Sequence, residues 1–267
     1  MKIFFALAIL VSAALSSHAY SQQNIKDFYL SNFKEDGSFD WEVRGTEALV
    51  YDDYVDIEAM NAHYYLKDDI IVITSDKARL NQKSLDVYLE KNVNIENKDG
   101  ARIITDSLNW QKAKNLIETK DWVKATRDDM EITAKGMSAD TEMKEAEFKE
   151  DVAVTFPDQE TKIPINATCS GPLEIEYSQG KAVFNENVVV THAQGQVFSD
   201  KSTLYFDPET KAIIKIVSEG NVKILREGSE TYAERATYLG KEDKLVLEGR
   251  PRLIYYPEEG KNPMGGF

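Results

Sequence analysis

The amino-acid sequence predicts an all-β protein, an antiparallel open-sided jellyroll built from repeats of about 30 residues. A polar phrase that ends in valine recurs five times, and its valines lie at positions 93, 123, 152, 188 and 222. The spacings are 30, 29, 36 and 34 residues. Apolar and polar residues alternate after the phrase, as in Val93-Asn94-Ile95, which is typical of a strand with one buried face. Helical periodicity is almost absent.

Each repeat is predicted to hold two or three strands. The phrase itself, such as Glu90–Val93, has turn-prone residues followed by the start of a strand. A second recurring stretch, of the type TSDKARL at 74–80, predicts another strand, and a short apolar strand such as Ile213–Val217 follows after a further turn. Thr141–Lys149 contains helix-forming residues but occupies a strand position of the repeat. Antiparallel zigzagging of such strands gives two facing sheets, and a parallel β-helix is the main alternative.

The repeat is interrupted at Phe156–Pro172, which holds three prolines and no alternation. Proline cannot donate a hydrogen bond to a strand ladder, so this stretch is predicted to be an edge or a linker. We therefore expect jellyroll segments at 24–160 and 165–257, which form either separate grooves or one continuous groove. The Gly- and Pro-containing tail at 258–267 is expected to be flexible, and a removable cap over the edge is the alternative.

The first 19 residues have the features of a signal peptide. Lys2 precedes the apolar run Ile3–Leu15, and Ser17–Ala19 supplies small residues for cleavage. The apolar run is shorter than the roughly 20 residues that span a bilayer. Residues 1–19 are therefore predicted to be a cleaved signal peptide of an exported protein, with an uncleaved N-terminal anchor as the alternative.

Composition and motifs argue against several function classes. The net charge of −14 without a basic cluster argues against nucleic-acid binding. The single cysteine, Cys169, cannot form an intramolecular disulfide. His63 and His192 are far apart in sequence, and no catalytic or metal-binding motif surrounds them. We expect no catalytic residue, no metal and no cofactor, although a calcium site at an acidic pair such as Asp52-Asp53 is an open alternative.

One half of each alternating strand is expected to face inward. Taken singly, each such residue is better explained as ordinary core. The inward candidates are Trp41, Val43, Ile57, Ile73, Leu89, Val93, Ile95, Val154, Ile175, Val190, Phe198, Phe206, Ile216, Val222, Ile224 and Leu247.

Two stretches of the sequence resemble the periplasmic bridge proteins of lipopolysaccharide export, a family with an OstA-like β-jellyroll domain. Phe33–Tyr65 resembles the opening of the component that docks on the inner-membrane transporter, with a glycine, a Trp-containing strand, a second glycine and then alanine in the next strand. Gly171–Pro251 resembles the soluble bridge subunit, whose units repeat a Gly-Asn-Val turn. The chain thus resembles a docking-type half joined to a bridge-type half.

The resemblance implies a non-catalytic periplasmic protein whose inward residues carry the acyl chains of lipopolysaccharide. It also implies head-to-tail pairing of edge strands. The N-terminal edge, near Ile25–Val43, would face the lipopolysaccharide ABC transporter of the inner membrane. The C-terminal edge, near Leu245–Tyr256, would face another jellyroll bridge or the outer-membrane translocon. The alternative function is a secreted β-helical carbohydrate-active enzyme or adhesin, which requires clustered Asp, Lys or Arg on one sheet face.

Overall fold

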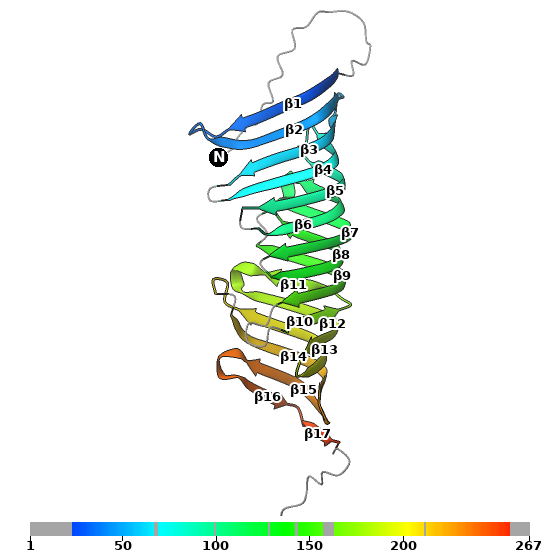
Figure 1. Cartoon of the computed structure of the whole chain (residues 1–267), viewed down its shortest axis with the longest axis vertical. Helices are drawn as coiled ribbons and strands as arrows, with labels where there is room; N and C mark the ends of the chain where they lie inside the picture. Colours follow the sequence, from blue (N-terminus) through cyan, green and yellow to red (C-terminus); the bar gives the residue numbers. More distant parts are fainter. Residues whose placement is uncertain are drawn as a thin grey trace, which may run out of the picture.

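The structure is a computed structural model, and it describes residues 23–256 except 67–68, 99, 128, 142–143, 157–162 and 211. Over this part of the chain it contains one 17-stranded sheet and three single-turn 3-10 helices (Figure 1). Every strand pairing in it is antiparallel, from β1 with β2 through β15 with β17. The predicted all-β antiparallel fold is therefore confirmed, and the parallel β-helix alternative is wrong for the described residues.

The strands follow one another along the chain with short connections. Their bounds are β1 Gln23–Phe33, β2 Phe39–Val50, β3 Tyr54–Tyr65, β4 Ile70–Asn81, β5 Val87–Asn97, β6 Arg102–Gln111, β7 Leu116–Arg127, β8 Met130–Asp140, β9 Glu145–Phe156, β10 Ile165–Cys169, β11 Leu173–Glu176, β12 Lys181–His192, β13 Gly195–Phe206, β14 Ile213–Arg226, β15 Ser229–Leu239, β16 Lys244–Glu248 and β17 Arg252–Tyr255. The 3-10 helices are η1 Lys112–Lys114, η2 Tyr177–Gln179 and η3 Gly240–Glu242.

The residue-by-residue pairing follows chain order, so the sheet grows along one axis. The strand β1 pairs with β2, β2 pairs with β3, and the series continues to β9. The short strands β10 and β11 share one position between β9 and β12. Likewise β16 and β17 share the position beyond β15. Figure 1 shows the result, an elongated stack with β1 at one end and β17 at the other.

The recurring phrase lies in the middle of a strand, which corrects the prediction that it is a turn before a strand. Glu90–Val93 lies within β5, and the pairing of β5 with β6 shifts between Glu90 and Val93. Lys91 and Asn92 have positive φ values of 63° and 52°. Such a β-bulge bends a strand without ending its pairing. Turns and bulges of this kind favour the same residues, because both place Asn, Asp or Gly at positive φ.

The bend is fixed by a contact between the two kinds of recurring stretch. The side-chain amide of Asn92 donates to Asp76 Oδ2 of β4 at 2.7 Å, and that of Asn221 donates to Asp200 Oδ2 of β13 at 2.9 Å. Asn187 of β12 donates in the same way to Ser170 Oγ at 2.9 Å. Asn92 and Asn221 thus hold an aspartate of the preceding strand, and Asn187 holds a serine in the break between β10 and β11. This contact gives a physical reason for the recurrence of both stretches.

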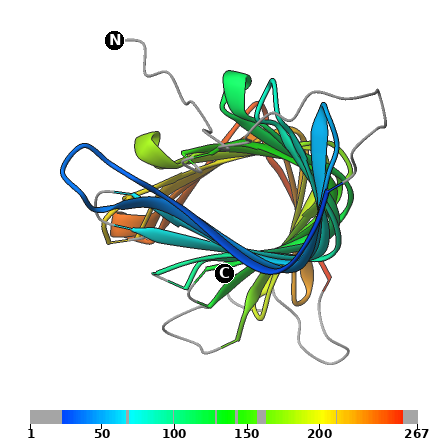
Figure 2. The ribbon, with the colours of Figure 1, turned by 90° about the horizontal axis from the view of Figure 1, so that it is seen from above.

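The bend divides each strand into two arms, and the inward residues of the two arms face each other. Seen along the long axis, the strands curve around a central region (Figure 2). The buried apolar cluster lies on the inward face of this curve. In β5, β7, β9, β12 and β14 the inward positions follow the spacing i, i+2, i+6, i+8, as in Val87, Leu89, Val93 and Ile95. In β4, β6, β8, β13 and β15 the spacing is i, i+2, i+5, i+7.

The valines of the phrase form the most buried column of the core, at the bend. Val93, Val123, Val152, Val188 and Val222 are each at most 2% exposed. A single apolar cluster extends along the interior from β1 to β12, and a smaller one contains Val222, Ile224 and Ala236. Buried serines of β13 and β14 lie between these clusters, where Ser202 is hydrogen-bonded to Ser199 at 3.0 Å and to Ser218 at 2.9 Å.

The sheet continues through the stretch that was predicted to be an edge or linker. Residues 165–169 form β10, which pairs with β9 on one side and with β12 on the other, so the prediction is wrong for these residues. Pro172 lies in the break between β10 and β11, where a missing donor costs no ladder hydrogen bond. The strand expected within 141–149 is confirmed from Glu145 onward.

The predicted signal peptide at 1–19 and the predicted tail at 258–267 lie outside the described residues. Among the described residues no helix has the length and apolar character that crossing a membrane requires.

Candidate functional site

The inward face of the bent sheet is the candidate site. The structure brings together on this face all of the sequence-predicted residues except Phe198. Four cross-strand pairs show this: Ile73 pairs with Ile95, Ile175 with Ala182, Ile216 with Leu204, and Leu247 with Ala236. The inward residues of the prediction are therefore Trp41, Val43, Ile57, Ile73, Leu89, Val93, Ile95, Val154, Ile175, Val190, Phe206, Ile216, Val222, Ile224 and Leu247.

Phe198 lies on the outward face, which corrects its placement among the inward residues. Its neighbour Val197 pairs with Val190 and Ile224, both of which belong to the interior. Phe198 pairs instead with Val189 and Lys223. Because successive residues of a strand point to opposite faces, Phe198 must point away from the interior. An unbroken alternation predicted the wrong face here because the bulge at 198–201 shifts the pattern by one residue.

The interior is closed at the bend and more accessible toward the ends of the strands. Leu89, Val93 and Val152 are buried beside the bend. Nearer the strand ends, Trp41 and Phe206 are half-buried although they lie on the same face. The inward face therefore has a packed floor and two accessible margins.

Part of the inward face was missed from the sequence. Leu108, Met137, Phe148, Leu173 and Phe184 are all at most 5% exposed and lie in one register row near the bend. Leu108, Met137 and Leu173 come from strands that lack the valine phrase. Phe148 and Phe184 precede the phrase in their own strands. The spacing i, i+2, i+5, i+7 in the intervening strands is the signal that would have identified the first two.

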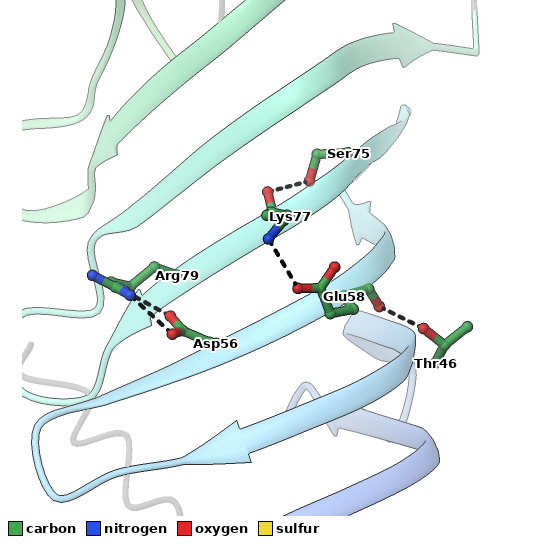
Figure 3. A network of polar contacts seen from close by, with 6 residues as sticks. All are labelled: Thr46, Asp56, Glu58, Ser75, Lys77 and Arg79. Carbon is green, nitrogen blue, oxygen red and sulfur yellow. Dashed lines mark hydrogen bonds and ion pairs between the residues drawn. The ribbon is translucent and has the colours of Figure 1, made fainter.

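The outward face is polar and contains several ion pairs between neighbouring strands. Figure 3 shows one such region on β2 to β4, where Arg79 donates two hydrogen bonds to Asp56, at 2.6 and 2.9 Å. In the same region Lys77 Nζ lies 3.3 Å from Glu58 Oε1. Opposite charges on facing strands stabilise the pairing. Such a surface faces water, so apolar ligands are left with the inward face.

A buried carboxylate lies on the outward face near the N-terminal edge. Glu42 of β2 accepts a hydrogen bond of 2.8 Å from the Tyr29 hydroxyl of β1, and its carboxylate lies 3.1 Å from Arg44 and 3.0 Å from His63 Nδ1 of β3. The hydrogen bond from Tyr29, together with the Arg44 charge, holds the pKa of Glu42 below its ordinary value. The same bond raises the pKa of Tyr29. The cluster fastens the edge strand to its neighbours.

Both ends of the sheet expose apolar side chains. At the first end, Ile25 and Leu30 of β1 are 46% and 49% exposed. At the other end, Leu253 of β17 is 68% exposed. Among the described residues, β1 pairs only with β2, and β17 pairs only with β15. Edges of this kind are available for pairing with another chain.

The described residues hold no group of three or more His, Cys, Asp or Glu side chains placed to bind a metal ion. At the acidic pair Asp52-Asp53, the Asp53 carboxylate is paired with Lys83.

Comparisons with known protein families agree with this geometry. A family model described as "Lipopolysaccharide-assembly, LptC-related" matches residues 6–156, and one described as "LptA/(LptD N-terminal domain) LPS transport protein" matches residues 169–265. A search of curated proteins gave no match. Both families consist of non-catalytic transport proteins, so the enzyme alternative is set aside. With more than half of its length covered by the first model, the chain belongs to the LptC-related family of lipopolysaccharide assembly, and it continues into a segment of the LptA/LptD N-terminal type.

Proposed function

We propose that this protein carries the acyl chains of lipopolysaccharide along its inward face and bridges the inner-membrane transporter to the outer membrane. The coarser statement, a role in the periplasmic lipopolysaccharide transport bridge, follows from the two families. The observation that carries the finer proposal is the continuity of the inward apolar face across the boundary between the two family segments. Val154 pairs with Ala167 there, and Phe148 pairs with Leu173.

An apolar interior favours movement of acyl chains along the inward face over tight binding at one place. Burial of acyl chains is favourable by about 0.8 kcal/mol per methylene group. Aliphatic side chains such as Val190 and Ile216 offer no directional contact, so a chain can slide past them. The half-buried margins support entry of acyl chains between the arms, while sugars and phosphates stay in water. The acidic outward surface supports the same division, since it repels anionic head groups.

The free edges support a bridging role. We infer that β1 pairs with a jellyroll of the inner-membrane transporter, and that β16 and β17 pair with another jellyroll bridge or with the outer-membrane translocon. Export by a cleaved signal peptide at residues 1–19 would place the chain in the periplasm. Backbone pairing gives such joints their affinity, and the exposed apolar residues of the edges add buried area.

Site-specific photo-crosslinking tests the lipid pathway. Val197 and Phe198 are adjacent in β13 but face inward and outward, respectively. A photoreactive residue at position 197 should give an adduct with lipopolysaccharide, and the same residue at position 198 is the matched control and should give none. Equal labelling at the two positions, or no lipid adduct at either, would contradict the proposal.

The same chemistry tests the two joints. A photoreactive residue at Lys26 in β1 should capture a component of the transporter, and one at Ile254 in β17 should capture the next jellyroll. Lys124, on the outward face of the central strand β7, serves as the control position and should capture neither. Capture of the same neighbours from Lys124 would show that the edges are not the joints.

A further inference from the structure

The two arms of the bent sheet end at two rims, and among the described residues two ring contacts join one rim to the other. The first rim contains the strand ends at Tyr65 and Arg127, and the second rim contains those at Gln111 and Glu176. Tyr64 of β3, at the first rim, contacts Trp110 of β6, at the second, with ring centroids 6.2 Å apart and ring planes at 79°. The guanidinium carbon of Arg127 in β7 lies 4.6 Å from the ring centroid of Tyr177 in η2.

These contacts span the open side of the sheet, because neither joins neighbouring strands. The strand β3 pairs with β2 and β4, so it reaches β6 only across the opening. Similarly, β7 pairs with β6 and β8, whereas Tyr177 follows β11. A contact along a single rim serves as a comparison. The ring centroids of Tyr177 and Phe206 are 5.8 Å apart, and Phe206 is the last residue of β13 on the same rim.

Contacts of this type can part without unfolding the protein. An edge-on aromatic pair and a cation–π pair are weak contacts between side chains. All four side chains are half-buried, and no strand pairing of the described residues joins the two rims. At the bend, by contrast, fully buried valines and continuous strand pairing hold the arms together. The opening can therefore widen while the bend stays intact.

The shape of the lipid makes such widening necessary. This step rests on the proposed function: the acyl chains lie inside and the sugars outside, so the part that connects them occupies the opening. A lipid that moves along the long axis must then meet every side chain that crosses the opening. We propose that Tyr64–Trp110 and Arg127–Tyr177 are latches across the open side, which part as lipopolysaccharide passes and close again behind it.

Cross-linking one latch tests the proposal. In a Cys169→Ala background, Arg127→Cys with Tyr177→Cys permits a covalent link across the opening with a short bismaleimide. Tyr177→Cys with Phe206→Cys shares one of these positions but links neighbours on a single rim, and it is the matched control. Photoreactive reporters at Val43, before both latches, and at Val197, beyond them, record the position of the lipid.

Linking across the opening should lower the lipid adduct at Val197 at least tenfold and leave the adduct at Val43 in place. Linking along one rim should change neither. An unchanged adduct at Val197 after complete cross-linking of the first pair would overturn the latch proposal. Absence of adduct at both reporters before cross-linking would instead refute the lipid pathway itself.

A second double-cysteine variant is a control for the case in which the first variant misfolds. Tyr64→Cys with Trp110→Cys locks the other latch and should give the same loss at Val197 after cross-linking. Each variant without the cross-linker should still label at Val197, because parting the latch removes a barrier to the lipid. Loss of that labelling in a variant with unchanged circular dichroism would also overturn the proposal.

Discussion

Leu173 offers a test of whether the two family segments fold as one unit. It lies in the second segment, is 1% exposed, and pairs with Phe148 of the first segment and with Phe184. Leu173→Ala removes three carbon atoms from a site that two aromatic rings surround, and substitutions of this kind cost about 3 kcal/mol. With a urea m value of about 3 kcal/mol/M, the unfolding midpoint should fall by about 1 M.

The assay uses the placement of the tryptophans. All three, Trp41, Trp110 and Trp122, lie in the LptC-related segment, so their fluorescence reports only on that half. If the core is shared, Leu173→Ala lowers the midpoint seen by tryptophan fluorescence although the substitution lies in the other half. Leu253→Ala, at a 68% exposed position, is the control and should shift the midpoint little. A tryptophan transition of Leu173→Ala that superimposes on the wild type would show that the segments unfold separately.

Three further substitutions and treatments test individual features. Asn221 has φ 47°, so Asn221→Val should lose about 1–2 kcal/mol more than Asn221→Gly in urea unfolding, and equal losses would show that the left-handed bend imposes no strain. Burial raises the pKa of the Cys169 thiol to about 11, so a disulfide reagent at mildly alkaline pH should label it only after urea is added; rapid labelling of the folded protein would mean that the core opens there. The pKa of Glu42 is lowered in the folded state, so its carboxylate stabilises the fold above the unfolded-state pKa, and this contribution is lost as pH falls through the folded-state pKa. The difference in melting temperature between the wild type and Glu42→Gln should therefore shrink between neutral pH and about pH 3, and a constant difference would argue against a role for the charge.

The sequence was sufficient for the strand content, the repeat and most of the inward face, because period-two alternation survives within each arm. It was misleading at the bend, where Asn92 and Asn221 carry the same signal as a turn residue. A strand that continues through a bulge differs from two strands joined by a turn only in its pairing partners, and these are distant in sequence. The misplacement of Phe198 has the same origin, since one bulge exchanges the two faces.

The rim contacts were beyond the reach of sequence patterns. Tyr64 and Trp110 are 46 residues apart and show no shared motif. Their meeting depends on how strongly every intervening strand bends and on the twist that accumulates between them. The prolines around Pro172 were misleading for a related reason, because a break within a strand position is as compatible with proline as an edge is.

The uniform bend has a consequence for length. Each added strand repeats the same cross-section at a spacing of about 4.8 Å along the long axis. Inserting or deleting one pair of strands would therefore change the length of the molecule by roughly 10 Å and leave its width unaltered. A gap between two membranes could thus be matched by duplication of a segment of some thirty residues, without redesign of either terminus.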